Sequence, residues 1–590
     1  MEINACEITI LMKECDEVRR RTASSVDDDN FGKKDLAYID TQGYVESMES
    51  DNNTLIFGRR GCGKTSLLLE VAKRNLYNCS PKLLISTDMQ INKTYDADII
   101  VCKIMLKIIK KVLKLVEDEI WDEVSKEFKK QYKGMSGLIK KISKKRNCET
   151  KNKFTQCKDF IYFCYKLENK ISEIQKMEKA VLYVVKSSSE IIKKDSKTQH
   201  SVLEIKGELI NENDISVKYK NLATKFELTN TFVKSIKSEK TTTNSKMDST
   251  QSMCEQQIEK RREDILVELK EAILCFVDDF YQITNKKIVL MLDDFYQIEL
   301  NYQPFVIQYF HDISKICRNK SFRFKIFAIP NRLRLNEKNP DLSYKDDFLP
   351  INIDNNIMDI NNLKDYLTKM LSGISKSANG DKYLTQKDVY NLFPRYNDDE
   401  VLLYLILASG AIPRDFIVMF RDVMQDARSN AQSVIGKENI YNSVRNLRKD
   451  KDNNVENDSN LQSDIIDELR KSLELNFVDK FKTNVFLYPI QDAEEKIQER
   501  ILNNMENLRY IYLISQSVTA ELTKEDCRAY MIDMSFCIAG KRLKNNFEMR
   551  KYWEKTSKSN VLRQSKVWKF PKETIEMVKK SIISTSTFLK

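Results

Sequence analysis

One glycine-rich segment carries the residue types and the spacing needed to hold phosphate groups. Residues 58–65 read Gly-Arg-Arg-Gly-Cys-Gly-Lys-Thr and fit the pattern G-x-x-x-x-G-K-[ST]. Glycine lets the backbone approach an anion closely, and the N–H groups at a helix start attract negative charge. The segment therefore predicts a nucleotide-binding loop, in which Lys64 contacts the β- and γ-phosphates and the Thr65 hydroxyl binds Mg²⁺.

The residues on either side of this loop have the hydrophobicity that it requires. Residues 53–57 predict a short buried strand, and residues 66–72 predict the start of a helix. A strand, a tight turn and a helix N-terminus together form an anion site. Apart from Arg414, the expected ATP-binding residues form one continuous run: Gly58, Arg59, Arg60, Gly61, Cys62, Gly63, Lys64, Thr65 and Ser66.

A nucleotide loop also needs an acidic partner at the end of a neighbouring strand, and two nearly identical strings compete for this role. Residues 277–283 (Val-Asp-Asp-Phe-Tyr-Gln-Ile) follow apolar residues at helical spacing, which predicts an amphipathic helix. Residues 292–298 (Leu-Asp-Asp-Phe-Tyr-Gln-Ile) follow an unbroken apolar run, which is typical of a parallel strand buried on both faces. The second string is therefore predicted to supply Asp293 for Mg²⁺ and Asp294 to polarise the attacking water.

Two more polar residues are expected at the phosphate end of the site. Residues 322–329 predict another strand, and Asn331 follows it, where a polar side chain can contact the γ-phosphate or the attacking water. A plain turn residue is the alternative for Asn331. Residues 409–416 (Ser-Gly-Ala-Ile-Pro-Arg-Asp-Phe) predict a helix start, where Arg414 opposes the helix dipole and is best explained by an anion facing it. The expected catalytic residues are Lys64, Asp294, Asn331 and Arg414.

The elements that must position these residues are separated by a long helix-forming stretch. From about residue 100 to 270 the chain is rich in Lys, Glu, Ile and Leu with almost no Pro or Gly, which predicts a mostly helical insertion. Residues 160–165 and 181–185 suggest helices packed as a hairpin. Near the C-terminus, the pattern predicts a helix (492–505), a strand (509–514), a polar turn (515–525) and a returning strand (527–533).

Composition excludes several other classes of protein. The 13 cysteines contain no C-x-x-C pair, and with only two histidines a histidine-rich metal site is not expected. We see no long uncharged apolar run and no basic segment at the N-terminus, so neither a membrane span nor a secretory signal is expected. Reduced thiols favour a cytoplasmic protein.

The positive charge is concentrated in two windows. The net charge is +11, and residues 541–569 carry ten Lys or Arg against two Glu, with Tyr552, Trp553 and Trp568 among them. Residues 126–146 form a second basic stretch. Such windows suit the phosphate backbone of DNA, although a solvated lysine-rich surface explains them equally well. Stacking of Trp553 or Trp568 on bases is one interpretation, and core packing is the other.

The motifs resemble those of AAA+ ATPases, in particular the bacterial-type origin-recognition-like branch and the related STAND NTPases. Four segments carry the resemblance: 58–65, 288–294 (Ile-Val-Leu-Met-Leu-Asp-Asp), 327–331 (Phe-Ala-Ile-Pro-Asn) and 409–416. The resemblance implies that Asn331 is the sensor-one residue and Arg414 the sensor-two residue. Asp294 stands where many AAA+ members have Glu. An aspartate at this position is common among STAND proteins, and the resemblance therefore implies slow hydrolysis. Arg332 and Arg334 follow Asn331, but neither lies in a diagnostic motif, so the identity of the arginine finger stays open.

The resemblance also implies a fold and a domain order. We expect an α/β P-loop NTPase core with a parallel sheet, a large helical insertion, a helical lid and a C-terminal winged-helix-like α+β domain. The expected boundaries are an N-terminal segment (1–45), a split core (46–100 and 271–350), the insertion (101–270), the lid (351–430), the winged-helix-like domain (431–540) and a basic tail (541–590).

Two functions are consistent with these expectations. The first is an ATPase that uses ATP and Mg²⁺ as a slow switch and assembles on nucleic acid, in genome maintenance, mobile-element or anti-phage defence. The second is a STAND-like signalling or scaffold ATPase that binds an effector protein rather than DNA. Either would be expected to form homo-oligomers. The Pro413–Arg414 motif and the chain length disfavour a small-molecule kinase built on the same loop.

Overall fold

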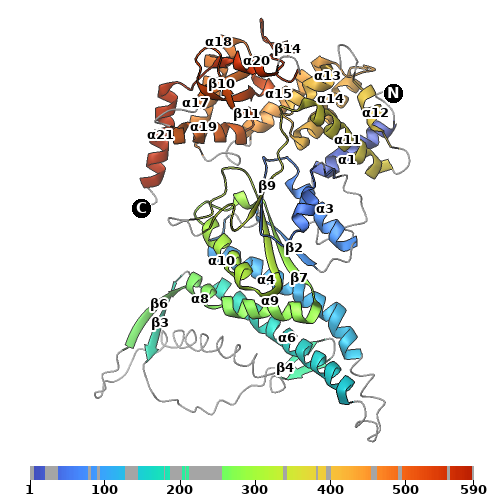
Figure 1. Ribbon diagram of the computed structural model, residues 1–590, viewed down its shortest axis with the longest axis vertical. Coiled ribbons are helices and arrows are strands. Elements are labelled where there is room, and N and C mark those ends of the chain that lie inside the picture. The colour runs from blue at the N-terminus through green and yellow to red at the C-terminus, as the bar shows by residue number, and fades with distance from the viewer. Residues whose placement is uncertain are drawn as a thin grey trace.

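The computed structural model describes most of the 590 residues in sixteen segments. The described residues are 6–19, 38–40, 42–77, 82–89, 94–126, 144–177, 180–186, 202–205, 208–211, 255–336, 342–379, 383–393, 400–453, 461–489, 495–554 and 558–587. Figure 1 shows a sheet in the middle of an elongated molecule, an insertion at one end of it, and the last two-fifths of the chain at the other end.

Five parallel strands form the central sheet. They are β1 (Thr54–Phe57), β2 (Lys82–Asp88), β7 (Lys287–Asp293), β8 (Phe322–Ala328) and β9 (Leu349–Asn352). Their order in space is β2-β7-β8-β1-β9, so the strands expected over 53–57, directly before Asp293 and over 322–329 are confirmed. Because every strand runs in the same direction, the residues that follow β1, β7 and β8 meet at one edge of the sheet.

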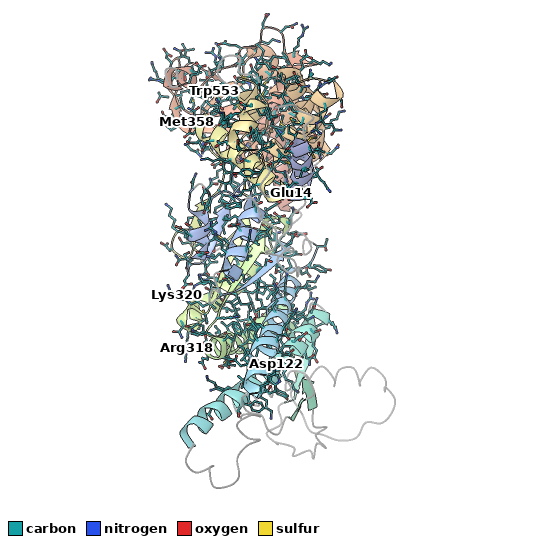
Figure 2. All side chains as sticks on the ribbon, turned by 90° about the vertical axis from the view of Figure 1, so that its right-hand side faces the viewer. Glu14, Asp122, Arg318, Lys320, Met358 and Trp553 are labelled. Carbon is teal, nitrogen blue, oxygen red and sulfur yellow. The ribbon has the colours of Figure 1, made fainter. Side chains whose placement is uncertain are left out.

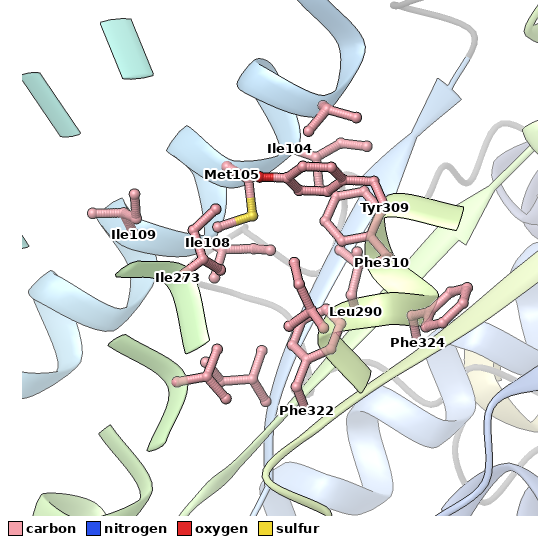
Figure 3. Packing of buried hydrophobic residues seen from close by; sticks show 14 of the residues in the cluster. Ile104, Met105, Ile108, Ile109, Ile273, Leu290, Tyr309, Phe310, Phe322 and Phe324 are labelled. Carbon is pink, nitrogen blue, oxygen red and sulfur yellow. The ribbon is translucent and has the colours of Figure 1, made fainter. Parts of the chain in front are cut away.

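Alternating side chains let helices cover both faces of this sheet. On β7, Val289 and Met291 pack with Leu68 of α3, whereas Leu290 faces the opposite cluster. Figure 3 shows Leu290 beside Phe324, among side chains of the helices that cover this second face. The helices are α2 (Tyr44–Glu49) and α3 (Lys64–Tyr77) on one face, and α4 (Ala97–Leu115), α9 (Lys270–Thr284) and α10 (Gln303–Ile316) on the other.

The insertion is helical next to the sheet but also contains strands. α4 continues into the π-helical turn η3 (Val116–Trp121), and the long helix α6 (Lys144–Lys176) packs against α4 and α9. The prediction of a helix over 181–185 is wrong, because β3 (Ala180–Lys186) pairs with β6 (Glu255–Arg261). Its Val-Leu-Tyr-Val-Val run has β-branched and aromatic residues that favour strands. The other elements are β4 (Val202–Ile205), β5 (Glu208–Asn211) and α8 (Arg262–Glu268).

A helical unit that we call the lid follows β9. It contains α11 (Ile360–Asn379), α12 (Gln386–Asn391), α13 (Glu400–Ala408), α14 (Pro413–Ser429) and α15 (Lys437–Asn453). The N-terminal helix α1 (Cys6–Arg19) packs on α11 and α14. α15 packs on α13 and α14, so the helical unit continues beyond residue 430.

The C-terminal domain, residues 461–587, combines helices with a second sheet. Its strands β10 (Val485–Pro489), β11 (Ile511–Thr519), β12 (Asp526–Ile532) and β15 (Lys566–Val567) have the order β11-β12-β10-β15. The helix and the two strands expected here are present, but β11 extends through residues 515–519, which were expected to form a turn. The helices are α17 (Ser463–Lys471), η8 (Ser472–Val478), α18 (Asp479–Phe481), α19 (Glu495–Asn507), η9 (Met534–Phe536), α20 (Lys558–Arg563) and α21 (Lys572–Thr587).

The basic segment after residue 541 forms part of this domain. β15 pairs with β10, Trp568 packs against Phe486, and Tyr552 is fully buried. Trp553 packs against the core that the lid shares with the second sheet, and Figure 2 shows it within this part of the molecule. The tryptophans therefore serve core packing, and the interpretation that they stack on bases is not supported. A short hairpin of β13 (Ile538–Ala539) and β14 (Arg542–Leu543) exposes Lys541 and Arg542.

No helix in the described segments combines the length and the hydrophobicity that a membrane span needs.

Candidate nucleotide-binding site

The phosphate loop leaves β1 at the edge where the strands of the central sheet end. The Gly58 N–H donates to the Ala328 carbonyl at the end of β8, which fixes the first loop residue. Gly61 and Gly63 have φ angles of 89° and 107°, in the region that favours glycine. A Cβ at Gly58 would lie 2.4 Å from the Cys62 sulfur, whereas a Cβ at Gly63 would meet no atom within 4 Å. The loop is thus packed behind Gly58 and open beside Gly63.

Lys64, the first residue of α3, holds its side chain within the loop. Only 5% of the residue is exposed, and Nζ donates to the carbonyls of Gly58 (2.6 Å) and Arg59 (3.0 Å). The Nζ atom also lies 5.8 Å from the centre of the Tyr296 ring. An ammonium group held by two loop carbonyls is positioned for an anion that binds in the open part of the loop.

A hydrogen bond joins the two halves of the predicted site. The Thr65 hydroxyl donates to Asp293 Oδ2 (2.7 Å), across 228 residues of sequence, and the Asp294 N–H donates to Asp293 Oδ1 (3.0 Å). Burial and the neighbouring charge of Asp294 raise the pKa of Asp293 to about 7, against the opposing effects of Thr65 and Lys64. The hydroxyl and the carboxylate are hard oxygen donors, which Mg²⁺ prefers, so these residues fit the expected ion.

Asp294 and Asp278, the first aspartate of the other string, lie in different environments. Asp294 follows β7 with a left-handed φ of 51°, precedes the 3₁₀ turn η6 (Phe295–Gln297) and is half-buried. Asp278 lies on α9 and accepts hydrogen bonds from the Arg318 N–H, in the 3₁₀ turn η7 (Arg318–Lys320), and from the Ser321 hydroxyl. The prediction that the second string ends a buried strand and the first lies on a helix is confirmed.

The remaining predicted residues lie around the loop at different depths. Arg60 and Ser66 are half-buried, and burial raises the pKa of the Cys62 thiol to about 11, so this thiol is neutral at pH 7. Asn331 is exposed with a φ of 63°, three residues beyond β8. A left-handed turn at the sheet edge is compatible with both interpretations of Asn331.

Arg414 lies directly against the loop. It is the second residue of α14, and its N–H donates to the Gly61 carbonyl (3.1 Å). A Cβ at Gly61 would lie 3.0 Å from Arg414 Cβ and Nε and from Ile412. The helix start that the Pro413–Arg414 motif predicted is confirmed, and it brings the lid into contact with the phosphate loop.

Replacing Gly61 by alanine is expected to weaken ATP binding about three- to tenfold. The new Cβ would strain a φ of 89° by roughly 1–2 kcal/mol and would press on Arg414. Isothermal titration of ATP into both proteins measures the change. Gly436→Ala is the matched control, because its φ lies outside the left-handed region and its nearest neighbour is 3.5 Å away. Equal losses in the two variants would contradict a specific role for the Gly61 turn.

Three contributors to the site were not predicted from the sequence, and two of them, Asp354 and Tyr512, lie far from the motifs. Asp354, two residues after β9, accepts a hydrogen bond from the Arg59 N–H (2.8 Å). Tyr296 has two cations near its ring, with Arg332 5.4 Å and Lys64 5.8 Å from the ring centre. Tyr512 of β11 contacts the Arg59 guanidinium. The repeated Asp-Asp-Phe-Tyr string was a signal for Tyr296, but no spacing pointed to Asp354 or Tyr512.

Comparison with known proteins adds one distant similarity. No protein-family model matches this chain, and no curated protein matches it. The chain is similar to the ORC1 protein of Aeropyrum pernix, solved in complex with DNA, with 10% identity over 83% of this chain and 86% of that chain and a TM-score of 0.30. Because that score is low, the class of protein is defined by the chain's own features. These are a mixed α/β fold and a five-stranded parallel sheet consistent with a P-loop NTPase core.

Proposed function

We propose that this protein binds ATP with Mg²⁺ at residues 58–66 and hydrolyses it slowly, as a molecular switch of the AAA+/STAND type. The observation that carries the proposal is the Thr65–Asp293 hydrogen bond, because it unites the phosphate loop with the acidic strand end. Neither motif alone is specific, but a nucleotide triphosphatase needs both at one sheet edge.

Each residue of the site has a role that follows from its position. Lys64 neutralises phosphate charge from within the loop, and the loop N–H groups and the start of α3 attract the same anion. Thr65 and Asp293 would hold Mg²⁺, which supplies charge stabilisation to the phosphates when bound. Asp294 accepts a hydrogen bond from the attacking water and orients it. Arg414 approaches the terminal phosphate from the lid, and Asn331 is proposed to contact the same group.

Nucleic acid is the partner that we propose for the switch, in genome maintenance, mobile-element or defence systems. Part of the basic window 541–569 is neutralised within the domain, since Lys544 pairs with Glu474 and Asp479. The hairpin tip, with Lys541 and Arg542 exposed, is the part that best suits a phosphate backbone. Most of the second window, residues 127–143, lies outside the described residues. A winged-helix architecture, a homo-oligomer and a cytoplasmic location are proposed with the same switch.

DNA binding measured with and without ATP at several salt concentrations tests this partner. The logarithm of the affinity should fall linearly with the logarithm of the salt concentration. Replacing Lys541 and Arg542 by Glu should weaken binding and reduce the slope by about 2. A variant with Lys369→Glu and Lys387→Glu, two exposed lid lysines, has the same net charge and should bind as the wild type does. Absent binding, or a flat salt response, would favour the effector-protein alternative, which an ATP-dependent and nuclease-resistant pull-down detects.

A further inference from the structure

The phosphate loop contacts the C-terminal domain through Arg59. The Arg59 guanidinium lies 5.5 Å from the centre of the Tyr512 ring and 3.6 Å from Asp354 Oδ1. Burial would lower the pKa of Arg59, but the neighbouring carboxylates of Asp354 and Glu506 outweigh that effect and raise it. A charged arginine over an aromatic ring within about 6 Å is an attractive pair. Arg59, the second residue of the phosphate loop, is therefore held in part by a residue of the C-terminal domain.

The backbone of Arg59 transmits this contact to the site. Its N–H donates to Asp354 Oδ1 (2.8 Å), and its carbonyl accepts a hydrogen bond from Lys64 Nζ (3.0 Å). The peptide groups of Arg59 therefore help to place the lysine that we expect to bind phosphate. If the Arg59 side chain moved and its backbone rotated with it, the Arg59 carbonyl that accepts from Lys64 Nζ would move as well.

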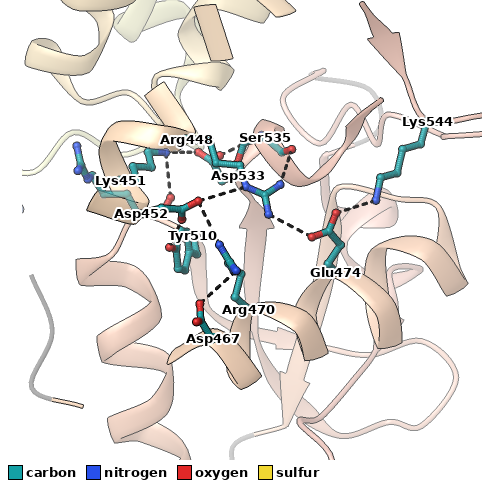
Figure 4. A network of polar contacts seen from close by, with 11 residues as sticks. Arg448, Lys451, Asp452, Asp467, Arg470, Glu474, Tyr510, Asp533, Ser535 and Lys544 are labelled. Atoms are coloured by element: carbon teal, nitrogen blue, oxygen red, sulfur yellow. Dashed lines mark hydrogen bonds and ion pairs between the residues drawn. The ribbon is translucent and has the colours of Figure 1, made fainter. Parts of the chain in front are cut away.

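Tyr512 is itself rigidly held. Its hydroxyl donates to Asp533 Oδ2 (2.8 Å) and accepts from Lys451 Nζ (3.1 Å), while Lys451 and Asp533 form a buried ion pair of 2.5 Å. Figure 4 shows Lys451 and Asp533 within the polar network that joins the lid to the C-terminal domain. The ring lies against Gly410, where a Cβ would come within 2.1 Å of it. Only glycine at position 410 leaves room for the ring beside the lid.

A second bridge runs parallel to the first. Arg509 lies two residues before β11. Its Nη1 atom donates to both carboxylate oxygens of the buried Asp415, Oδ1 (2.9 Å) and Oδ2 (2.7 Å). Asp415 adjoins Arg414, whose N–H binds the Gly61 carbonyl. Residues of one short segment of the C-terminal domain therefore reach both Arg59 and the helix start that contacts Gly61.

We propose that Tyr512 is a positioning residue of the nucleotide site, which acts by holding Arg59 and, through it, the start of the phosphate loop. On this proposal, the C-terminal domain contributes to the ATP site through Tyr512, in addition to the partner binding proposed for it above. This inference rests on the proposed ATP binding. The competing interpretation is that Tyr512 only stabilises the contact between the lid and the C-terminal domain.

A double-mutant cycle on ATP affinity separates these interpretations. Tyr512→Leu and Arg59→Met are each expected to weaken ATP binding about three- to tenfold, which corresponds to a partly buried cation–π contact. The double variant should be no weaker than the weaker single variant, because both changes remove the same contact. Tyr512→Phe keeps the ring and should bind ATP nearly as the wild type does. Losses that multiply in the double variant would overturn the proposal.

Controls distinguish a structural effect from a positioning effect. Tyr488→Leu makes the same change at a buried tyrosine on the other face of the second sheet, so it should lower the unfolding temperature and leave ATP affinity unchanged. If Tyr512→Leu does not fold, Arg59→Met in the wild-type and Tyr512→Phe backgrounds must still weaken binding equally. Unchanged affinity in Arg59→Met overturns the inference.

The result for Lys64 shows which proposal has failed. If Lys64→Ala binds ATP as the wild type does, the proposed nucleotide site itself is wrong. If Lys64→Ala loses binding and Tyr512→Leu does not, the nucleotide site stands and the role of Tyr512 is refuted.

Discussion

Replacing Lys64 by alanine is expected to abolish productive ATP binding, with a dissociation constant that rises about 100-fold. A charge-assisted contact to phosphate contributes about 3 kcal/mol, and alanine leaves the phosphate charge without its main cationic partner. The Nζ atom lies inside the loop, so no neighbouring lysine can take its place without rearranging Gly58 and Arg59. Titration with ATP and Mg²⁺, followed by a steady-state phosphate-release assay, measures both binding and turnover.

Lys369→Ala is the matched control for this change. Lys369 lies on α11, is about half exposed and pairs with Asp365 one helical turn away. Its loss removes one positive charge and one surface ion pair, which contributes about 0.3–0.5 kcal/mol at most. The control should bind and hydrolyse ATP normally. Normal ATP affinity in Lys64→Ala would refute the assignment of the phosphate loop.

Replacing Asp294 by asparagine is expected to slow ATP hydrolysis about 100- to 1,000-fold and to change ATP affinity less than about twofold. Asparagine keeps the size of the side chain but removes the charge that polarises the attacking water. Asp293 and Thr65 are untouched, so the contacts proposed for Mg²⁺ remain. Single-turnover hydrolysis, measured at saturating ATP, separates this effect from binding.

The chain provides its own control in the twin string. Asp278→Asn makes the same change in the repeated Asp-Asp-Phe-Tyr-Gln-Ile string, at the aspartate that corresponds to Asp293, but on α9, where the carboxylate accepts hydrogen bonds from Arg318 and Ser321. Its expected effect is a loss of roughly 1 kcal/mol of stability with normal hydrolysis. Slow hydrolysis in Asp278→Asn and normal hydrolysis in Asp294→Asn would reverse the assignment of the two strings.

The core of the site could be predicted because its residues are fixed by local periodicity. The apolar run before Asp293 and the helical spacing before Asp278 distinguish two nearly identical strings, since only one of them lies in a strand buried on both faces. The glycine spacing of the loop and the Pro413–Arg414 helix start are likewise local signals. Each depends on residues within one turn or one strand.

The parts that could not be predicted depend on contacts between distant segments. Nothing near Tyr512 shows that it faces Arg59, because the contact joins residues more than 450 positions apart and requires the fold of two domains. The pairing of β15 with β10 is a two-residue ladder in a basic segment, too short to give a periodic signal. The strand over 180–186 was hidden by a helix-rich composition around it, although its β-branched residues favoured it.

The long sequence separation between Thr65 and Asp293 has a consequence for the order in which the protein folds. Closing a loop of 228 residues costs about 5 kcal/mol of chain entropy, more than the hydrogen bond across it can return. We therefore expect the site to form only after the sheet has brought β1, β8 and β7 together, late in folding. ATP bound at the proposed site would therefore stabilise the finished chain and not its partly folded forms, so nucleotide would favour chains that have completed folding.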